Sequence, residues 1–384
     1  MWRFFSLLAL PAYAGIVFYI GTKCLALIQY FQPAFRAYIF WPLHILICIS
    51  FIAAFFLRFD WLRHTAMLLF PFIVYLFMAL LAVDAVKLVM RLIQQHPVSG
   101  ELSAAGTGIA LGITVLLIAY GSHHARDIRT AHYEINLDKS IENPLHVALV
   151  SDLHIGSASM TPEHIATIVD TVNNIQPDIV CISGDIFDGG IDSARDLEHK
   201  LAELKRLSAP MGVFACPGNH DVDRLSLRET SDGTGSSRIK QLLENAGITL
   251  LSDETVLIND SFYLIGRKDM RPIGLDAKRK TAAELTSDLD KSLPLIVMDH
   301  QPMDFQAIEE AGGDLILSGH THRGQFFPGN VMTHLIFKKA GAVNYGHWQG
   351  KSSQAIVTSG AGIWGPPVRI GTDSEVALIE IKLK

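Results

Sequence analysis

The first third of the chain contains four long apolar stretches separated by short charged segments. Each stretch approaches the roughly 20 residues that a membrane-spanning helix needs. Four consecutive stretches of this kind with so few charges favour membrane helices over helices buried in a soluble core. They are Phe4–Thr22, Tyr38–Leu57, Thr65–Val83 and Ser103–Tyr120. The pattern therefore predicts a four-helix transmembrane domain over residues 1–126.

Two features of these apolar stretches allow other interpretations. Arg3, a short apolar run and Pro11-Ala12-Tyr13-Ala14 resemble a cleavable signal peptide, but the apolar run continues further, which favours an uncleaved helix. His44 could be a proton or metal site, but we expect it to bond to a neighbouring helix. No stretch carries the several paired charges expected of an ion or substrate pathway. The helices are therefore predicted to be an anchor.

From about residue 130 the chain alternates between amphipathic segments and short apolar runs. The predicted helices are Thr161–Ile175, Arg195–Leu207, Ser237–Ala246 and Pro302–Ala311, and a run of strands covers Thr249–Leu251, Thr255–Ile258 and Ser261–Ile265. Alternating helices and strands, with consecutive strands added, indicate an α/β domain with a two-sheet layered core over residues 127–384. Residues 224–237 are polar and form either a mobile lid or a plain surface loop.

Five other apolar runs are predicted to be buried strands, and each ends in side chains that can bind a metal. The runs are His146–Val150, Ile179–Ser183, Gly212–Cys216, Leu295–Met298 and Asp314–Ser318. The side chains that follow them are Asp152 and His154; Asp185 and Asp188; Asn219, His220 and Asp221; His300; and His320 and His322. Open α/β folds place their ligands at the carboxyl edge of the sheet. The repeated pattern predicts a metal-dependent hydrolase.

The charge of the chain is divided unequally between its two parts. Residues 1–126 carry eight Lys or Arg and three acids, a net charge of +5, and the remainder carries 24 basic and 35 acidic residues, a net charge of −11. An acidic soluble part argues against nucleic acid as a partner, because phosphate backbones need a basic face. Acidity also suits a site that gathers divalent cations.

The basic residues that flank the apolar stretches predict how the chain is oriented in the membrane. An even number of spans places the amino terminus and the predicted catalytic domain on one side. Five basic residues would lie on that side, Arg3, Arg58, Arg63, Arg126 and Arg129, against Lys23, Arg36, Lys87 and Arg91 on the other. The positive-inside rule then favours a multi-pass protein of the inner cell membrane with a cytoplasmic catalytic domain.

The spacing and chemistry of the strand-end residues predict two bound ions. Asp152 and His154 are two residues apart and can point to one side, as can His320 and His322. Gly184 permits a tight turn that leaves the Asp185 carboxylate free to bridge. Carboxylate, imidazole and amide ligands without thiolate suit Mn²⁺, Fe or Zn²⁺. Seven such groups exceed the three or four ligands of a single zinc ion.

The order of these motifs resembles that of the calcineurin-like metallophosphoesterases. The resemblance covers roughly residues 145–384 and rests on the following blocks: Asp152-x-His154, Gly184-Asp185-x-x-Asp188, Gly218-Asn219-His220-Asp221, His300 and Gly319-His320-Thr321-His322. The segments Arg323-Gly324-Gln325 and Gly365-Pro366-Pro367-Val368-Arg369 are similar to those of a bacterial membrane-associated phosphodiesterase subgroup, some of whose members have multi-pass amino termini. The resemblance implies a four-layer α/β/β/α sandwich after the membrane domain.

The resemblance also implies a role for each site residue. One ion would be held by Asp152, His154, Asp185 and His322, and the second by Asp185, Asn219, His300 and His320. His220 would be the general acid or transition-state stabiliser, oriented by Asp188 or Asp221. Asp299, directly before His300, departs from the usual pattern and could act behind the ligands. Asn344, Tyr345 and Arg369 could approach a substrate.

These observations predict a membrane-anchored, dinuclear metal-dependent phosphoesterase. A hydroxide that bridges the two ions would attack a phosphodiester or pyrophosphate. Anchoring at the bilayer makes a phospholipid or lipid-linked nucleotide an attractive substrate, although a phosphorylated small molecule remains an alternative. A different class of function is a membrane sensor or transport protein with a regulatory phosphoesterase-like domain. The complete ligand set argues against that alternative.

Overall fold

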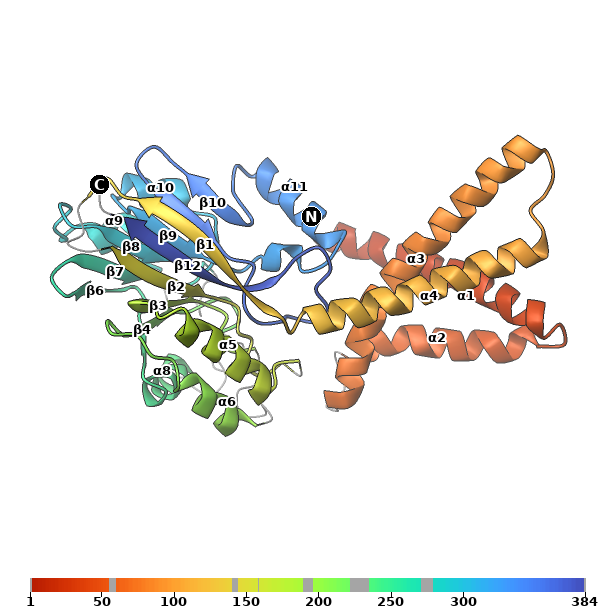
Figure 1. Ribbon diagram of the computed structural model, residues 1–384, viewed down its shortest axis with the longest axis horizontal. Coiled ribbons are helices and arrows are strands. Elements are labelled where there is room, and N and C mark those ends of the chain that lie inside the picture. The colour runs from red at the N-terminus through yellow and green to blue at the C-terminus, as the bar shows by residue number, and fades with distance from the viewer. Residues whose placement is uncertain are drawn as a thin grey trace. The chain divides into compact units, whose positions relative to one another are not determined.

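The chain separates into two compact units, which are described one by one. The computed structural model describes residues 2–54, 60–139, 144–157, 159–188, 196–221, 235–270 and 279–382 (Figure 1). The first unit is Met1–His123 with Pro366–Val368, and the second is His124–Gly365 with Arg369–Lys384. Of the polar stretch expected to be a lid or a loop, residues 224–234 lie outside the described residues, and a helix starts at Gly235.

The first unit consists of helices, as the apolar stretches predicted. They are α1 (Trp2–Phe31), α2 (Ala37–Ala54), α3 (Asp60–Gln94) and α4 (Gly100–His124). Three of the described segments are long and apolar enough to cross a membrane, namely Leu10–Phe31, Thr65–Gln94 and Gly100–His124. The fourth apolar helix contributes the shorter segment Ala37–Ser50. The structure thus contains three candidate spans and a shorter apolar helix where the sequence predicted four spans.

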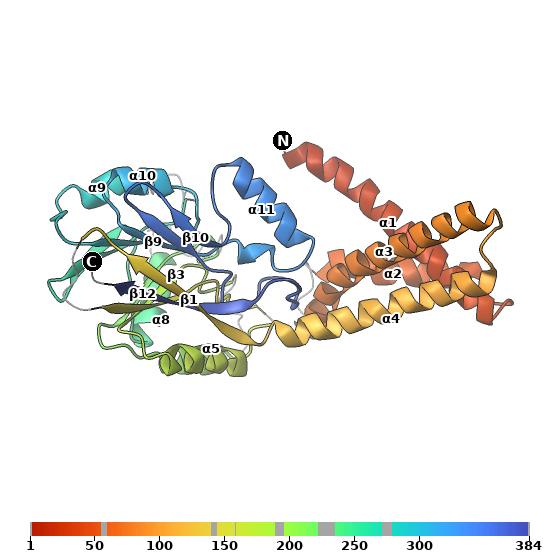
Figure 2. The ribbon, with the colours of Figure 1, turned by 45° about the horizontal axis from the view of Figure 1, so that its top comes forward.

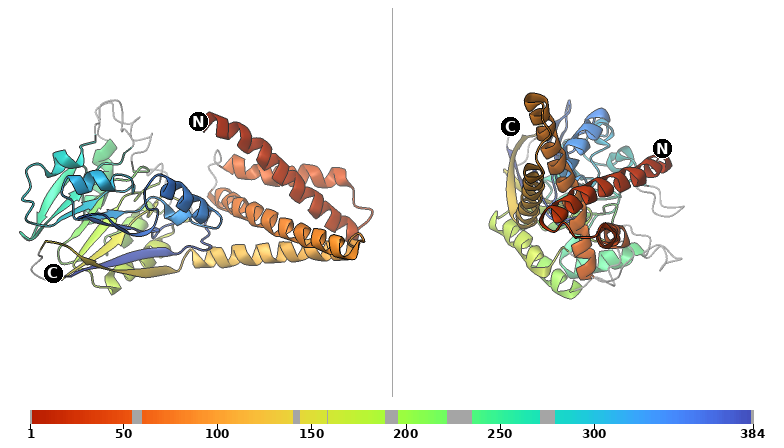
Figure 3. Two further views of the ribbon diagram at one scale, coloured as in Figure 1. Left: turned by 90° about the horizontal axis from the view of Figure 1, so that it is seen from above. Right: turned by 90° about the vertical axis from the view of Figure 1, so that its right-hand side faces the viewer.

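Polar bonds join the helices of the first unit at a few points. His44 Nε2 in α2 lies 2.9 Å from the Val17 carbonyl oxygen in α1, the expected bond to a neighbouring helix. Asp84 in α3 accepts a hydrogen bond from Tyr19 at 2.7 Å and pairs with Lys23 at 2.6 Å. Lys87 in α3 donates to Ser103 in α4 at 2.8 Å, and Figure 3 shows the helices of this unit from two sides. Such interhelical bonds are worth about 1 kcal/mol each in a membrane and fix which faces meet.

Two six-stranded sheets form the centre of the second unit. The first has the order β1 (Ile128–Asn136), β12 (Ser374–Lys382), β2 (Leu145–Val150), β3 (Ile179–Ser183), β4 (Val213–Cys216), β5 (Ile248–Leu250). The second has the order β10 (Gly346–Gln349), β11 (Gln354–Val357), β9 (Leu315–Ser318), β8 (Leu295–Met298), β7 (Phe262–Gly266), β6 (Glu254–Ile258). Strands β2 to β5 are parallel to one another, and so are β7, β8, β9 and β11. All five predicted ligand-bearing strands are present.

Helices cover the outer face of each sheet, so the unit has four layers. Figures 1 and 2 show α5 (Pro162–Asn174) on one outer face and α9 (Ala282–Thr286) with α10 (Phe305–Glu310) on the other. The helices α6 (Leu197–Leu204) and α8 (Gly235–Asn245) lie on the same side as α5. One apolar cluster packs between the two sheets, and a further cluster packs under each helical layer. The predicted α/β/β/α sandwich is confirmed.

The sequence did not predict β1, α9, α11 (Gly329–Lys339), β10, β11 or β12, and two of these, β1 and α11, bury little apolar surface. Strand β1 is mostly half-exposed, so its residues form no apolar run. The helix α11 buries none of its residues. Helix α10 begins at Phe305 rather than at Pro302. Helix α5, by contrast, has the expected cap, because the Thr161 hydroxyl accepts a hydrogen bond from the His164 amide.

Candidate metal centre

The carboxyl ends of β2, β3 and β4 in one sheet meet those of β8 and β9 in the other. Strand β3 contacts both β8 and β9. The loops that follow the strands are joined by backbone bonds, such as Asp152 N to Gly184 O at 3.0 Å and Gly319 N to His300 O at 3.0 Å. A bond from His320 N to Asp152 Oδ2, also 3.0 Å, connects the two sheets. The five predicted strand ends therefore form one site.

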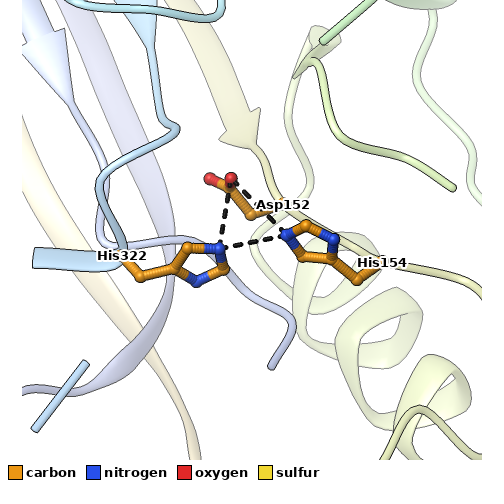
Figure 4. Close-up of side chains that lie close together, drawn as sticks. All are labelled: Asp152, His154 and His322. Atoms are coloured by element: carbon orange, nitrogen blue, oxygen red, sulfur yellow. Dashed lines mark hydrogen bonds and ion pairs between the residues drawn. The ribbon is translucent and has the colours of Figure 1, made fainter. Parts of the chain in front are cut away.

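The first group of converging side chains consists of Asp152, His154 and His322 (Figure 4). The Nε2 atoms of the two histidines lie 3.0 Å apart. His322 Nε2 lies 3.4 Å and His154 Nε2 lies 3.9 Å from Asp152 Oδ1. All three side chains are buried. Two ring nitrogens and a carboxylate oxygen this close together could hold a single cation.

The second group consists of Asp185, His300 and His320, whose ligand atoms lie within 4.8 Å of one another. His300 Nε2 lies 3.0 Å from Asp185 Oδ2. The same oxygen lies 3.9 Å from His154 Nε2 of the first group, so Asp185 stands between the two groups. His300 Nδ1 donates to the Ser183 carbonyl oxygen at 2.8 Å, which fixes the ring and leaves Nε2 for a ligand.

Several buried polar atoms at the site have no hydrogen-bond partner among the described residues. They include Asp152 Oδ1 and Asn219 Oδ1. An unpaired buried oxygen costs roughly 1–3 kcal/mol, so native proteins seldom leave one unexplained. Asn219 is buried with 5% exposure. Hard oxygen ligands and imidazoles without thiolate fit divalent Mn, Fe or Zn, and a cation at the first group would satisfy Asp152 Oδ1.

His220 lies at the edge of the ligand groups and is held by Asp188. Its Nδ1 lies 2.8 Å from Asp188 Oδ1, and its ring is 4.9 Å from the ring of His154. Asp221, the other proposed partner, accepts bonds from the backbone amides of Gly218 at 2.7 Å and Phe187 at 2.8 Å. Of the two carboxylates, Asp188 orients the ring, and Asp221 holds the loops after β3 and β4 together.

Burial and mutual attraction set the ionisation of the site residues. Burial raises the pKa of Asp152 to about 6 and lowers the pKa of His154 to about 4. Burial opposes the charge on Asp185 and His300 as well. Their attraction across 3.0 Å nevertheless raises the pKa of His300 to about 10 and lowers the pKa of Asp185 well below its usual range. A proton on His300 thus balances Asp185, and a metal cation would replace that proton.

Five of the seven expected ligands have a left-handed backbone. The φ angles are 59° at Asp152, 46° at His154, 51° at Asp185, 72° at His320 and 46° at His322. Outside glycine, such angles cost roughly 1–3 kcal/mol each and cluster at functional sites. Asp tolerates this region better than β-branched residues do. The strand ends therefore turn sharply so that the ligands face inward.

Gly184 is needed for this packing. Its φ is +78°, and a side chain there would place a Cβ 2.6 Å from His300 Nδ1. A glycine lets the backbone after β3 pass directly under the imidazole ring. The sequence interpretation of Gly184 as a tight turn before Asp185 agrees with this geometry.

Arg369 does not face a substrate, contrary to the expectation from the sequence. Its side chain is fully buried, and its guanidinium donates to the carbonyl oxygens of Ser359 (2.8 Å), Gly360 (3.1 Å), Gly362 (3.0 Å) and His322 (3.2 Å). Burial lowers the pKa of Arg369 to about 10, so the group stays charged at neutral pH. Arg369 thereby fixes the backbone of a proposed metal ligand.

The other residues singled out from the sequence are also held by protein contacts. Tyr345 donates to Glu375 at 2.9 Å and lies under Arg323, whose guanidinium carbon is 4.0 Å from the ring centre. Asn344 is buried, and its carbonyl oxygen accepts the Thr321 hydroxyl. Asp299 pairs with Arg267 at 2.6 Å and with Arg279. Asp299 therefore anchors the loop behind His300, as its position in the sequence suggested.

Trp364 adjoins the site but was not identified from the sequence. Its ring centre lies 6.0 Å from that of His220, at an interplanar angle of 70°, and the side chain is 48% exposed. A single tryptophan in a loop carries no local signal of its own. Its position directly before the Gly365-Pro366-Pro367 segment that carried part of the resemblance was the available clue.

Replacing His300 tests the second ligand group. We expect His300→Ala to bind one ion where the parent protein binds two, because it removes an imidazole from that group. Metal content is measured by mass spectrometry after loading with Mn²⁺ or Zn²⁺. His164→Ala, which removes a buried histidine outside the ligand groups, is the matched control. Equal metal content in His300→Ala and the parent would contradict the ligand assignment.

Replacing Arg369 tests its role in holding the site together. Arg369→Met keeps most of the apolar stem of the side chain but removes the guanidinium that donates to four backbone carbonyls. We expect the free energy of unfolding to fall by at least about 2–4 kcal/mol. Arg129→Met is the control, because Arg129 is 56% exposed and forms only surface ion pairs. The thermal unfolding midpoints of the two purified variants are compared with that of the parent protein. Equal midpoints for both variants would refute the structural role of Arg369.

Comparison with known proteins agrees with this geometry. The sequence profile of the calcineurin-like phosphoesterases matches residues 145–324. A metallophosphoesterase of Aquifex aeolicus, itself uncharacterized, is 30% identical over 276 residues, which cover 71% of this chain and 98% of that protein. A further uncharacterized metallophosphoesterase, from Helicobacter pylori strain 26695, is 33% identical over 258 residues, or 64% of this chain. The chain spans 62% of the length of that relative.

A relative with a named activity is more distant. The UDP-2,3-diacylglucosamine pyrophosphatase LpxG of Chlamydia trachomatis is 23% identical over 267 residues, which cover 57% of this chain and 78% of that protein. The profile match includes all five strand ends, and the Aquifex aeolicus relative is covered almost completely. The chain therefore belongs to the calcineurin-like metallophosphoesterases.

Proposed function

We propose that the chain is a membrane-anchored phosphoesterase that uses two metal ions to hydrolyse a phosphodiester or pyrophosphate bond. Residues 1–126 would anchor it, and residues 127–384 would carry the reaction. One observation supports this proposal above the others. Two groups of candidate ligands adjoin, because Asp185 Oδ2 of the second group lies 3.9 Å from His154 Nε2 of the first, and a histidine that is bonded to its own carboxylate stands beside them.

The proposed ligands divide into two sets that meet at Asp185. Asp152, His154, Asp185 and His322 would hold one ion, and Asp185, Asn219, His300 and His320 the other. When bound, two such cations lower the pKa of a shared water and neutralise charge on the phosphoryl oxygens. The buried unpaired oxygens of Asp152 and Asn219 support their inclusion among the proposed ligands.

The proposed role of His220 is to move a proton at the leaving oxygen. Its Nδ1 is bonded to Asp188, so Nε2 is the nitrogen that would donate the proton. Asp188 fixes the ring orientation and stabilises its charged form, as a carboxylate does behind a general acid. Asp221 would act indirectly, because it holds the loops that carry Asp185 and Asn219.

Three observations support a lipid substrate. The chain carries three segments that are able to cross a membrane. The predicted catalytic domain is acidic, which disfavours nucleic acid. Moreover, one relative is named a pyrophosphatase of a diacylated nucleotide sugar. A phosphodiester or pyrophosphate in a phospholipid or lipid-linked nucleotide is therefore the proposed substrate, with a soluble phosphorylated molecule as the alternative.

A substrate panel with two variants tests the proposed reaction. The full-length protein in detergent, loaded with Mn²⁺, Fe or Zn²⁺, is assayed on phosphomonoesters, diesters, pyrophosphates and lipid phosphodiesters. We expect His220→Ala to lower turnover by roughly 10²–10⁴-fold while metal content stays near two ions. Asp188→Asn should lower turnover less, because the ring remains. A metal-replete protein that is inactive on the whole panel would favour a regulatory domain in a sensor or transport protein.

The membrane orientation is a separate prediction. The basic residues around the helices favour a cytoplasmic predicted catalytic domain. We expect a fluorescent protein fused after Lys384 to fold and emit, and alkaline phosphatase fused at the same position to stay inactive. Fusions after residue 97, between α3 and α4, should give the reverse result. Active alkaline phosphatase after Lys384 would place that domain outside.

A further inference from the structure

Helix α11 presents an apolar surface with no protein partner among the described residues. Over 11 residues it buries none of its side chains. Val331, Met332, Leu335 and Ile336 are 45%, 59%, 59% and 63% exposed. Single exposed apolar residues are ordinary, but four on one short helix mark an interaction surface.

The four residues occupy a single face of the helix. Val331 and Leu335 are four residues apart, as are Met332 and Ile336, so they form two adjacent rows. Phe337, which points to the opposite side, is half-buried. A helix of 11 residues is marginal in water without a packed face. Burial of the exposed face in an apolar environment would therefore stabilise the helix.

The charge of the chain segment that contains this helix suits an anionic surface. From Leu315 to Thr372 the chain contains no Asp or Glu and five basic residues, although residues 127–384 as a whole are strongly acidic. Lys338 and Lys339 form the last turn of α11 and are exposed. Lysines at the end of an apolar helix face can extend to lipid phosphates.

Contacts within the second unit place the start of α11 near the end of a candidate membrane span. That span ends at His124, and His124 Nε2 lies 3.0 Å from Asp373. Next to it, Ser374 donates to the Ala125 carbonyl oxygen at 2.9 Å. A few residues earlier, Thr372 bonds to Gln325, and the Ile370 carbonyl accepts the Phe327 amide at 2.9 Å. The segment Ile370–Ser374 thus contacts both the end of the candidate span, at His124 and Ala125, and the residues that precede α11.

We propose that α11 is an interfacial helix whose apolar face inserts into the surface of an anionic lipid bilayer. Amphipathic helices with lysines beside the apolar face lie in the plane of the headgroup region, with the apolar face buried by about 5–10 Å. The same segment of chain carries the proposed ligand His322 seven residues before the helix begins. The insertion would present the metal centre to lipid headgroups, and this consequence rests on the proposed function.

A depth measurement tests the insertion without any activity. The full-length protein is reconstituted in vesicles of phosphatidylglycerol and phosphatidylethanolamine, and Leu335→Cys is labelled with an environment-sensitive fluorophore. We expect blue-shifted emission that is quenched by lipids with a nitroxide on the acyl chain. Leu257→Cys is the control, because Leu257 is an exposed leucine (39%) on strand β6. The parent protein, treated alike, gives the background from the native cysteines.

Each result of the depth measurement decides the proposal. Quenching at Leu335→Cys and not at Leu257→Cys supports it. Absence of quenching at Leu335→Cys overturns it and leaves the face for the helices of the first unit or for a second copy of the chain. Disulfide formation between two Leu335→Cys chains in vesicles, with no quenching, would identify the second copy.

A second experiment measures the consequence for turnover. Leu335→Glu places a charge on the inserted face, and Leu257→Glu is the matched control. We expect Leu335→Glu to hydrolyse a phosphodiester lipid in vesicles about tenfold more slowly, because apolar burial at the bilayer is lost. Hydrolysis of water-soluble bis(p-nitrophenyl) phosphate should stay at the parent rate. Equal loss on both substrates, or on neither, would overturn the link between α11 and lipid substrates. A parent protein inactive on both, with quenching intact, would instead refute the proposed function alone.

Discussion

The buried charge at the junction of the two sheets is the constraint on which the rest of the fold depends. Asp152 and Asp185 lie out of water, and several atoms around them have no hydrogen-bond partner among the described residues. Isolated buried charges are too costly to persist without compensation. In the absence of metal, a proton on His300 compensates one of them. Divalent cations would compensate both and would turn a destabilising cluster into the element that joins the sheets.

The architecture around this cluster limits how far the site can relax. Its ligands arise from both sheets, so the site can be preserved only if the sheets keep their relative position. The apolar cluster between the sheets and the bond from His320 N to Asp152 Oδ2 serve this purpose. Left-handed backbone angles at five ligands add roughly 1–3 kcal/mol of strain each. Arg369 opposes that strain at His322 by binding four carbonyl groups at once.

The sequence predicted those parts of the molecule in which a short apolar run is followed directly by side chains that can bind a metal. The ligand-bearing strands are short apolar runs that end in Asp, Asn or His, so both their positions and their meeting point followed from the pattern. The role of Arg369 did not, because a buried arginine that binds carbonyl groups has the same local sequence as one that binds a substrate. Similarly, both Asp188 and Asp221 were candidates for orienting His220. Only the positions of the side chains separate the carboxylate that contacts the ring from the one that contacts the backbone.

Helix α11 escaped prediction for a reason that bears on function. Helices were recognised by an apolar stripe next to a polar face, since a globular core requires that pattern. In α11 the apolar stripe faces outward and no residue is buried, so the stripe contributes to none of the apolar clusters. A short helix that does not pack against a core needs contacts outside the domain to be stable. The proposed source of these contacts is the bilayer, because the segment Ile370–Ser374 contacts both the end of a candidate membrane span and the residues before α11. Residues 315–372 include no acid that would oppose an anionic surface.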